Sequence, residues 1–187
     1  MRSNVKFPLV LSMSLLCFMH GCYIPFHDPE EQYEPDIKTE PGKITSENYF
    51  DFGKIIAADG DHVMVSSQQA IHIFKNNSLD IELIQTIDFA EICFISSMIV
   101  YRSELIFGIY DLDGTGTVYI YKRNGDLWEL SQEIRKGRSH DMFGCTIDID
   151  GETMVIGANS FRSDCTDANT CQGMVYVFQK REGVGEE

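Results

Sequence analysis

One pattern occurs three times along this chain: short runs of Val, Ile, Phe and Tyr, bounded by Gly, Asp and Asn. The clearest copy runs from Phe143 to Phe178 and contains a strand, an Asp150-Gly151 turn, a second strand, a long polar loop and a third strand. The other copies start at Phe52 and Phe94, so successive starts are 42 and 49 residues apart. Short strands that repeat at this period are typical of the blades of a β-propeller.

Dipeptides that favour tight hairpin turns separate several of these runs. Asp59-Gly60 and Asp150-Gly151 are predicted to join the first two strands of copies one and three, and Asn124-Gly125 the last two strands of copy two. The other predicted strands are 62–67, 71–74, 81–87, 104–108, 118–121, 127–130, 155–158 and 174–178. No segment predicts a helix, so we expect an all-β protein with about three four-stranded antiparallel blades.

The strand count predicts an incomplete propeller. Copies one and two supply four strands each, whereas copy three ends after its third strand. A spare strand near residues 36–45 is expected to complete the third blade. Three blades are still fewer than the usual four to eight. Either two chains meet head to tail as a homodimer in a six-bladed ring, or the chain is a fragment of a longer propeller, which is the interpretation we favour.

Copy three also carries a family resemblance. Phe143-Gly144, Asp150-Gly151, 155–158 and 175–178 together resemble the FG-GAP repeats of bacterial surface propellers, which are related to the integrin α-chain head. The resemblance covers residues 44–182 and is weakest in copy two, where Phe94-Ile95 replaces Phe-Gly. Integrin-type repeats bind calcium through a D-x-D-x-D-G loop between their first two strands. That loop is reduced here to an Asp-Gly turn, so the resemblance does not imply the same calcium site.

The N-terminus has the pattern of an export signal. Two basic residues precede an apolar run from Phe7 to Met19, which is too short to span a bilayer as a helix. Cys22 follows His20-Gly21, an arrangement that resembles the lipobox of bacterial lipoproteins. We therefore expect a signal peptide at 1–21 and a lipid on Cys22 that anchors the chain to a membrane of the bacterial cell envelope. A plain secretory signal and an uncleaved anchor are the alternatives.

The remainder of the chain is acidic. Residues 22–43 hold four of the five prolines and several acids, and we expect a solvated tether there; residues 183–187 form a polar tail. Removing residues 1–21 leaves 13 Lys and Arg against 29 Asp and Glu, a net charge of −16. Such a surface repels nucleic acid and anionic lipid headgroups, so neither is an expected partner.

Two cysteine pairs remain after Cys17 and Cys22 are set aside. Cys165 and Cys171 lie in a polar loop and are candidates for a disulfide in an oxidising compartment. Cys93 and Cys145 lie in apolar strand patterns, where a buried thiol is expected.

Acidic loops are the other candidate sites. Asp111 and Asp113 could bind calcium through loop oxygens, although Asp and Gly are also common in loops for turn formation alone. A second acidic cluster surrounds Cys165 and Cys171 and has the same two interpretations. We therefore predict no cofactor and keep calcium as an option at Asp111 and Asp113.

No catalytic motif accompanies these loops. The chain has no G-x-S-x-G, H-E-x-x-H or phosphate-binding glycine loop, and His62, His72 and His140 are scattered. Trp128 is expected in the outer packing of a fourth strand. The sequence therefore predicts a non-enzymatic binding module that contacts an unidentified protein or glycan through its inter-strand loops. A calcium-assisted enzyme and a truncated gene product without a role of its own are the alternatives.

Overall fold

The computed structural model describes residues 37–40, 42–47, 49–77, 80–89, 93–136, 140–159 and 173–179. The chain divides into Met1–Glu34 and Pro35–Glu187, and every described residue lies in the second part. Within the described residues there are thirteen strands and no helix, and accordingly no helix that could cross a membrane. The predicted all-β class is confirmed.

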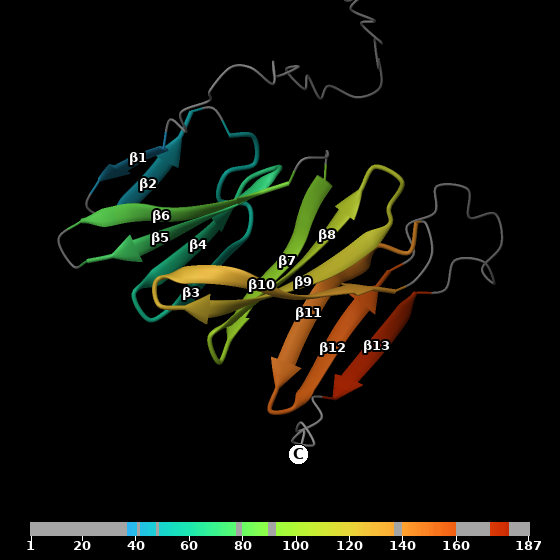
Figure 1. The fold of residues 1–187 in the computed structure, drawn as a ribbon. Helices are drawn as coiled ribbons and strands as arrows, with labels where there is room; N and C mark the ends of the chain where they lie inside the picture. Colours follow the sequence, from blue (N-terminus) through green and yellow to red (C-terminus); the bar gives the residue numbers. More distant parts are fainter. Residues whose placement is uncertain are drawn as a thin grey trace, which may run out of the picture. The chain divides into compact units, whose positions relative to one another are not determined.

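Three antiparallel sheets follow one another along the chain, one for each predicted blade (Figure 1). The first blade contains β3 (Ile56–Asp59), β4 (His62–Ser66), β5 (Ala70–Asn76) and β6 (Ile81–Asp88). The second contains β7 (Cys93–Tyr101), β8 (Glu104–Asp111), β9 (Gly116–Asn124) and β10 (Leu127–Arg135). The third contains β11 (Phe143–Asp150), β12 (Thr153–Ala158) and β13 (Met174–Gln179). Strands pair in chain order in each blade, which is the pattern of an incomplete β-propeller.

The predicted hairpin turns are confirmed. Asp59 pairs with His62, Asp150 pairs with Thr153, and the glycines between them have φ of 62° and 58°. The turn between β7 and β8 was not predicted, because Arg102 and Ser103 adopt φ of 50° and 64° there without any glycine. A turn made by residues that rarely take positive φ has no dipeptide signature in the sequence.

The prediction of a spare strand that completes the third blade is wrong. Residues 37–46 form two strands, β1 (Ile37–Glu40) and β2 (Lys43–Ser46), which pair with each other as a separate sheet. Gly42, at φ 76°, makes the turn between them. A local hairpin closes a much shorter loop than a pairing with β13 across the whole chain, and its entropic cost is lower. β1 also lies in the range that we had assigned to the tether.

Corresponding residues of the blades face the next blade. Counted from the hairpin between the first two strands, Met64, Ile106 and Val155 occupy the same position. The third strand supplies two further equivalent sets, aligned by their pairing with the second strand. We call these three positions the acceptor face: Met64, Ile71 and Ile73 in the first blade; Ile106, Val118 and Ile120 in the second; Val155, Val175 and Val177 in the third.

The acceptor faces of the first two blades form the core of the molecule. The first packs against Met98, Leu105 and other apolar residues of the second blade. The second packs against Phe143, Met154 and Ile156 of the third blade. All six acceptor residues of these two blades are at most 9% exposed. Burial of apolar side chains between the sheets therefore holds consecutive blades together.

The third blade is joined to the second by a Phe-Gly turn, residues 142–144. Gly144 approaches the second blade so closely that a Cβ added at Gly108 would overlap its carbonyl oxygen. A Cβ at Gly116 would overlap the carbonyl oxygen of Phe143. The hydroxyls of Ser96 and Ser97 donate hydrogen bonds of 2.9 and 2.7 Å to the Gly144 carbonyl. The glycine pair Gly108 and Gly116 is thus the structural partner of the Phe-Gly turn.

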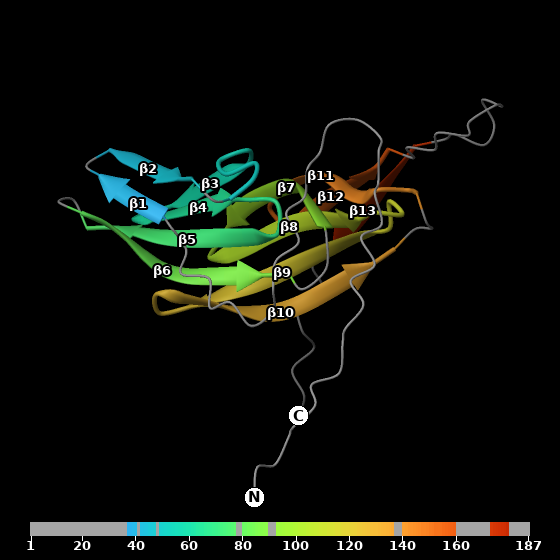
Figure 2. The same cartoon turned by 90° about the horizontal axis from the view of Figure 1, so that it is seen from above.

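The first and second blades meet differently. Trp128 of β10 is 1% exposed and lies in the core between these blades, not in the outer packing of the fourth strand as predicted. Gln85 of β6 donates to the Trp128 carbonyl at 2.9 Å and accepts from its amide at 2.8 Å. These bonds link β6 to β10, which contact each other along the outer side of both sheets (Figure 2).

Candidate functional site

The loop between β8 and β9 holds both predicted metal ligands. Asp111 ends β8, and the amide of Thr115 donates 2.9 Å hydrogen bonds to Oδ1 of Asp111 and Oδ1 of Asp113. The Asp111 amide also donates to the Thr115 carbonyl at 3.1 Å. Both carboxylates therefore fold the loop on itself, as Asp side chains commonly do in turns.

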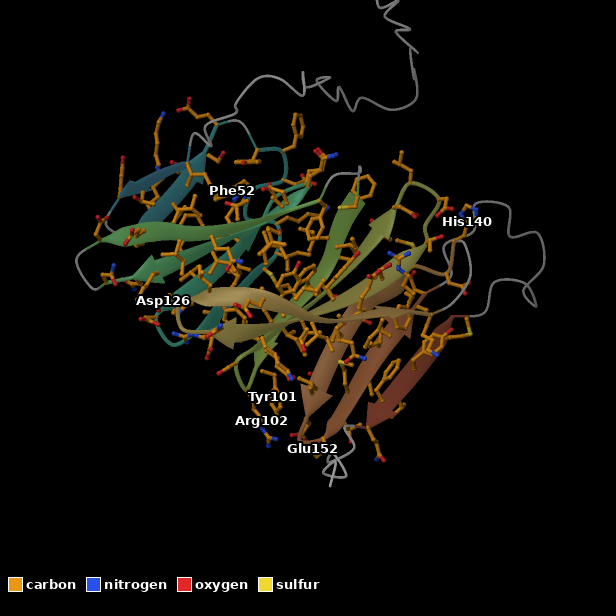
Figure 3. The ribbon with its side chains drawn as sticks, in the orientation of Figure 1. Phe52, Tyr101, Arg102, Asp126, His140 and Glu152 are labelled. Atoms are coloured by element: carbon orange, nitrogen blue, oxygen red, sulfur yellow. The ribbon has the colours of Figure 1, made fainter. Side chains whose placement is uncertain are left out.

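The turn before β11 braces this loop from the side. The amide of His140 donates to the Asp113 carbonyl at 3.0 Å, and the amide of Met142 donates to the Gly114 carbonyl at the same distance. Gly114 has φ 74°, and a Cβ there would lie 2.9 Å from Cα of His140. Figure 3 labels His140 where the chain enters the third blade. The loop and the Phe-Gly turn of the next blade are thus one connected unit.

The two carboxyl groups titrate as a pair. Burial raises the pKa of Asp111, and its hydrogen bond with Asp113 adds to that increase. The same hydrogen bond, together with that from Thr115, lowers the pKa of Asp113 to about 2. As the pH falls, Asp111 therefore takes up a proton before Asp113 does, and Asp113 remains ionised down to about pH 2.

This geometry suits a rigid contact loop better than a calcium shell. Calcium takes six to eight oxygen ligands, and no group of three or more His, Cys, Asp and Glu gathers among the described residues. Leu112, between the two acids, is 72% exposed. The loop therefore presents one apolar side chain on a backbone that is fixed from both sides.

A cleft of about 230 Å³ lies between the second and third blades at the opposite ends of these strands. Arg102 pairs with Glu152 at 3.1 Å across it, and the guanidinium stands 5.1 Å from the centre of the Tyr101 ring (Figure 3). Ile106, Ile120, Ile134 and Met154 line its apolar part. Its volume is below the usual range of small-molecule sites, so the cleft is better described as a joint between blades.

Ion pairs join the first and second blades near Asp126 (Figure 3). Lys75 pairs with Asp126 at 2.7 Å, which raises the pKa of Lys75 and lowers that of Asp126. Arg123 lies 3.7 Å from Asp59 and from Asp61. These pairs connect β9 and the following turn to β5 and to the first hairpin of the preceding blade.

His62 lies beneath these ion pairs. It is 0% exposed, with Nδ1 2.7 Å from Asp61 and Nε2 3.7 Å from Asp126. Neither ring nitrogen makes a well-aligned hydrogen bond. An imidazole enclosed in this way supports packing between blades and is not accessible to a substrate.

The remaining predicted residues fall into two groups. Cys93 is buried, as its strand pattern predicted, whereas Cys145 is only half-buried. Cys22, the candidate disulfide Cys165–Cys171 and the second acidic cluster lie outside the described residues. Sequence reasoning missed Ser96, Ser97 and the glycine pair. Gly108 and Gly157 lie equally far after the first hairpin of their blades, and Gly116 and Gly173 each lie two residues before a third-strand valine, so these positions could have indicated the pair.

Comparison with known proteins supports the repeat. The sequence profile of the FG-GAP repeat family matches residues 135–178, the third blade with the segment that enters it. Among solved structures, the N-terminal domain of Nup159 shares 12% identity with a TM-score of 0.30. The alignment covers 69% of this chain and 45% of that domain, so the chain spans less than half of that structure. A search of the curated proteins found no match.

Proposed function

We propose that this protein is a non-enzymatic binding module, a β-propeller segment that is exported, anchored by a lipid on Cys22, and engaged with a protein or glycan through its inter-strand loops. The loop between β8 and β9 carries the proposal. Its carboxylates are engaged in holding the backbone, while Leu112 remains 72% exposed. A fixed loop loses little conformational entropy on binding, and an exposed apolar side chain supplies contact area.

A photocrosslinking amino acid at position 112 tests the contact. On intact bacterial cells that express the full chain, we expect a discrete covalent adduct after irradiation. Leu127 is the matched control, because it is a 50% exposed leucine in the turn region of β10. Equal adducts from positions 112 and 127, or none from position 112, would contradict the assignment of this loop.

Radiolabelled palmitate tests the anchor separately. We expect the wild-type chain to incorporate the label in a bacterial host and Cys22→Ala to lose it. Cys17→Ala is the control, since it changes another cysteine of the same N-terminal region and leaves the motif before Cys22 intact. Labelling that persists in Cys22→Ala removes the anchor from the proposal.

A further inference from the structure

The third blade exposes the face that the other two blades bury. Val175 and Val177 are 71% and 65% exposed, whereas the equivalent residues of the other blades are at most 9% exposed. Thr146 takes the place of Ser97 in the register with the second strand and is also exposed. An apolar face with this arrangement is typical of an interaction surface.

The exposed face also carries a glycine pair. Gly157 and Gly173 correspond to Gly108 and Gly116 of the second blade. A Cβ at Gly157 would overlap the Thr146 hydroxyl, so a contact within the third blade already requires glycine at this position. Among the described residues, the nearest atom to a Cβ added at Gly173 is the Ala158 carbonyl oxygen at 3.4 Å, which is an ordinary van der Waals contact. In the second blade the equivalent space is filled by the Phe-Gly turn of the next blade.

The first blade carries a Phe-Gly turn, residues 51–53, that no blade receives within the described residues. Asp51 and Gly53 have φ of 57° and 84°, close to the 49° and 90° of Met142 and Gly144. The amide of Lys54 donates to the Asp51 carbonyl at 3.1 Å, as Cys145 does to Met142 at 3.0 Å. The turn therefore already has the conformation of the docked one.

The surroundings of this first turn are open. A Cβ at Gly53 would meet no atom of the described residues within 4 Å. Phe50 and Ile56 are 58% and 67% exposed, and Ile56 corresponds to Ile147, which packs against the core between the second and third blades. Farther along the same side, the Tyr49 ring covers His72 at 4.4 Å. A partner would therefore contact the side of the first blade that carries the Phe-Gly turn and Ile56.

Within the described residues, a joint between two blades has either both a Phe-Gly turn and a glycine pair or neither of them. The second blade starts with the continuous strand β7, and the first blade has Ser66 and Gln69 where the glycine pair would stand, so their joint uses neither feature. The joint between the second and third blades uses one of each. One Phe-Gly turn in the first blade and one glycine pair in the third are left over.

We propose that the acceptor face of the third blade binds the Phe-Gly turn of the first blade in a second copy of this chain. The Gly53 carbonyl accepts a hydrogen bond from the Thr146 hydroxyl of the other copy, and Ile56 packs on Val175 and Val177. The contact is head to tail, and two copies of three blades give six, within the range of closed propellers. We therefore propose the homodimer in place of the fragment that the strand count alone favoured. The contact depends on neither the lipid anchor nor the Leu112 loop.

Two substitutions test this contact from its two sides. Gly173→Ala adds a methyl group that the isolated chain accommodates but a docked turn does not, and Ile56→Asp places a carboxylate in the apolar contact. The full chain in mild detergent is measured by light scattering from about 1 to 200 µM, with the detergent contribution subtracted. We expect particles of two chains for the wild type, and a dissociation constant raised about tenfold or more in each variant. Each variant should keep the wild-type melting temperature at low concentration, and Leu127→Ser is the neutral surface control.

A mixture of the two variants distinguishes the geometry. A pair made of one chain of each variant has one joint with an unaltered turn on an unaltered acceptor face, and one joint that carries both substitutions. Through the unaltered joint, the mixture should form paired particles at concentrations at which each variant alone, with both joints altered, stays as single chains. Paired particles that Ile56→Asp leaves unchanged would indicate two-fold pairing of third blades and overturn the proposal. Single chains of the wild type at every concentration, or no recovery on mixing, would overturn it as well.

Discussion

Single residues hold the blades and loops of this protein together, and His72 illustrates how much one side chain contributes to stability. The ring is 0% exposed, with Nε2 3.1 Å from the Ser67 hydroxyl and Nδ1 3.4 Å from that of Thr86. Burial lowers the pKa of His72 from 6.5 to about 4. Its position corresponds to that of Tyr176 in the third blade, and Phe52 packs on His72 as Phe143 packs on Tyr176.

The shifted pKa predicts how stability depends on pH. Above pH 6.5 the imidazole is neutral in both states; below that pH the unfolded chain binds a proton that the folded chain takes up only near pH 4. The contribution of His72 is therefore lost as the pH falls, by about 3 kcal/mol between pH 6.5 and 4. Urea unfolding of wild type and His72→Gln across this range checks the slope. Equal slopes in the two proteins would contradict this assignment.

The paired acids of the β8–β9 loop give a second test at this scale. Since Oδ1 of Asp111 and Oδ1 of Asp113 already accept the Thr115 amide, we expect no saturable calcium uptake below about 0.1 mM by calorimetry. Asp113→Asn is the comparison, because it keeps the size of the side chain and removes its charge. Tight uptake that is lost in Asp113→Asn would restore the calcium-assisted alternative.

The secondary elements were largely predictable because their signals are local. Alternation of apolar residues and the Asp-Gly turns indicated most strands to within a few residues, since both depend on neighbours in the sequence. The Arg102-Ser103 turn was missed because it contains no glycine. The β1–β2 hairpin was misassigned although Pro41-Gly42 is a turn dipeptide, because the prolines and acids around it predicted a solvated tether. The place of Trp128 was wrong for another reason: its pattern shows that it is buried, not which blade buries it.

The link between β6 and β10 gives a prediction at the scale of elements. Gln85→Ala removes a side chain that both donates to and accepts from the Trp128 backbone, so we expect the free energy of unfolding to fall by about 1–3 kcal/mol. Trp128 is the only tryptophan, so its fluorescence follows this joint directly. The exposed Gln132 of β10 is the matched control, and equal losses in Gln85→Ala and Gln132→Ala would show that the link contributes nothing specific.

The whole molecule is a series of blades joined by contacts between residues far apart in the sequence. Ser97 and Gly144, like Gln85 and Trp128, belong to different sheets and are in contact because the two sheets pack together. The sequence repeats show where blades begin, but not which face of one blade meets the next. The same difference applies to the loop between β8 and β9. Asp111 and Asp113 were predicted as polar loop residues from the local sequence, whereas their bracing by the turn at His140 depends on packing between blades and was not.

A comparison of Gly116→Ala with Gly173→Ala tests this account most directly. The two glycines occupy equivalent positions, and only the first receives the Phe-Gly turn of a following blade. In urea unfolding followed by Trp128 fluorescence, at a concentration where single chains predominate, we expect Gly116→Ala to lose about 3 kcal/mol and Gly173→Ala less than about 0.5 kcal/mol. Equal losses in the two variants would contradict the docking of the third blade on the second.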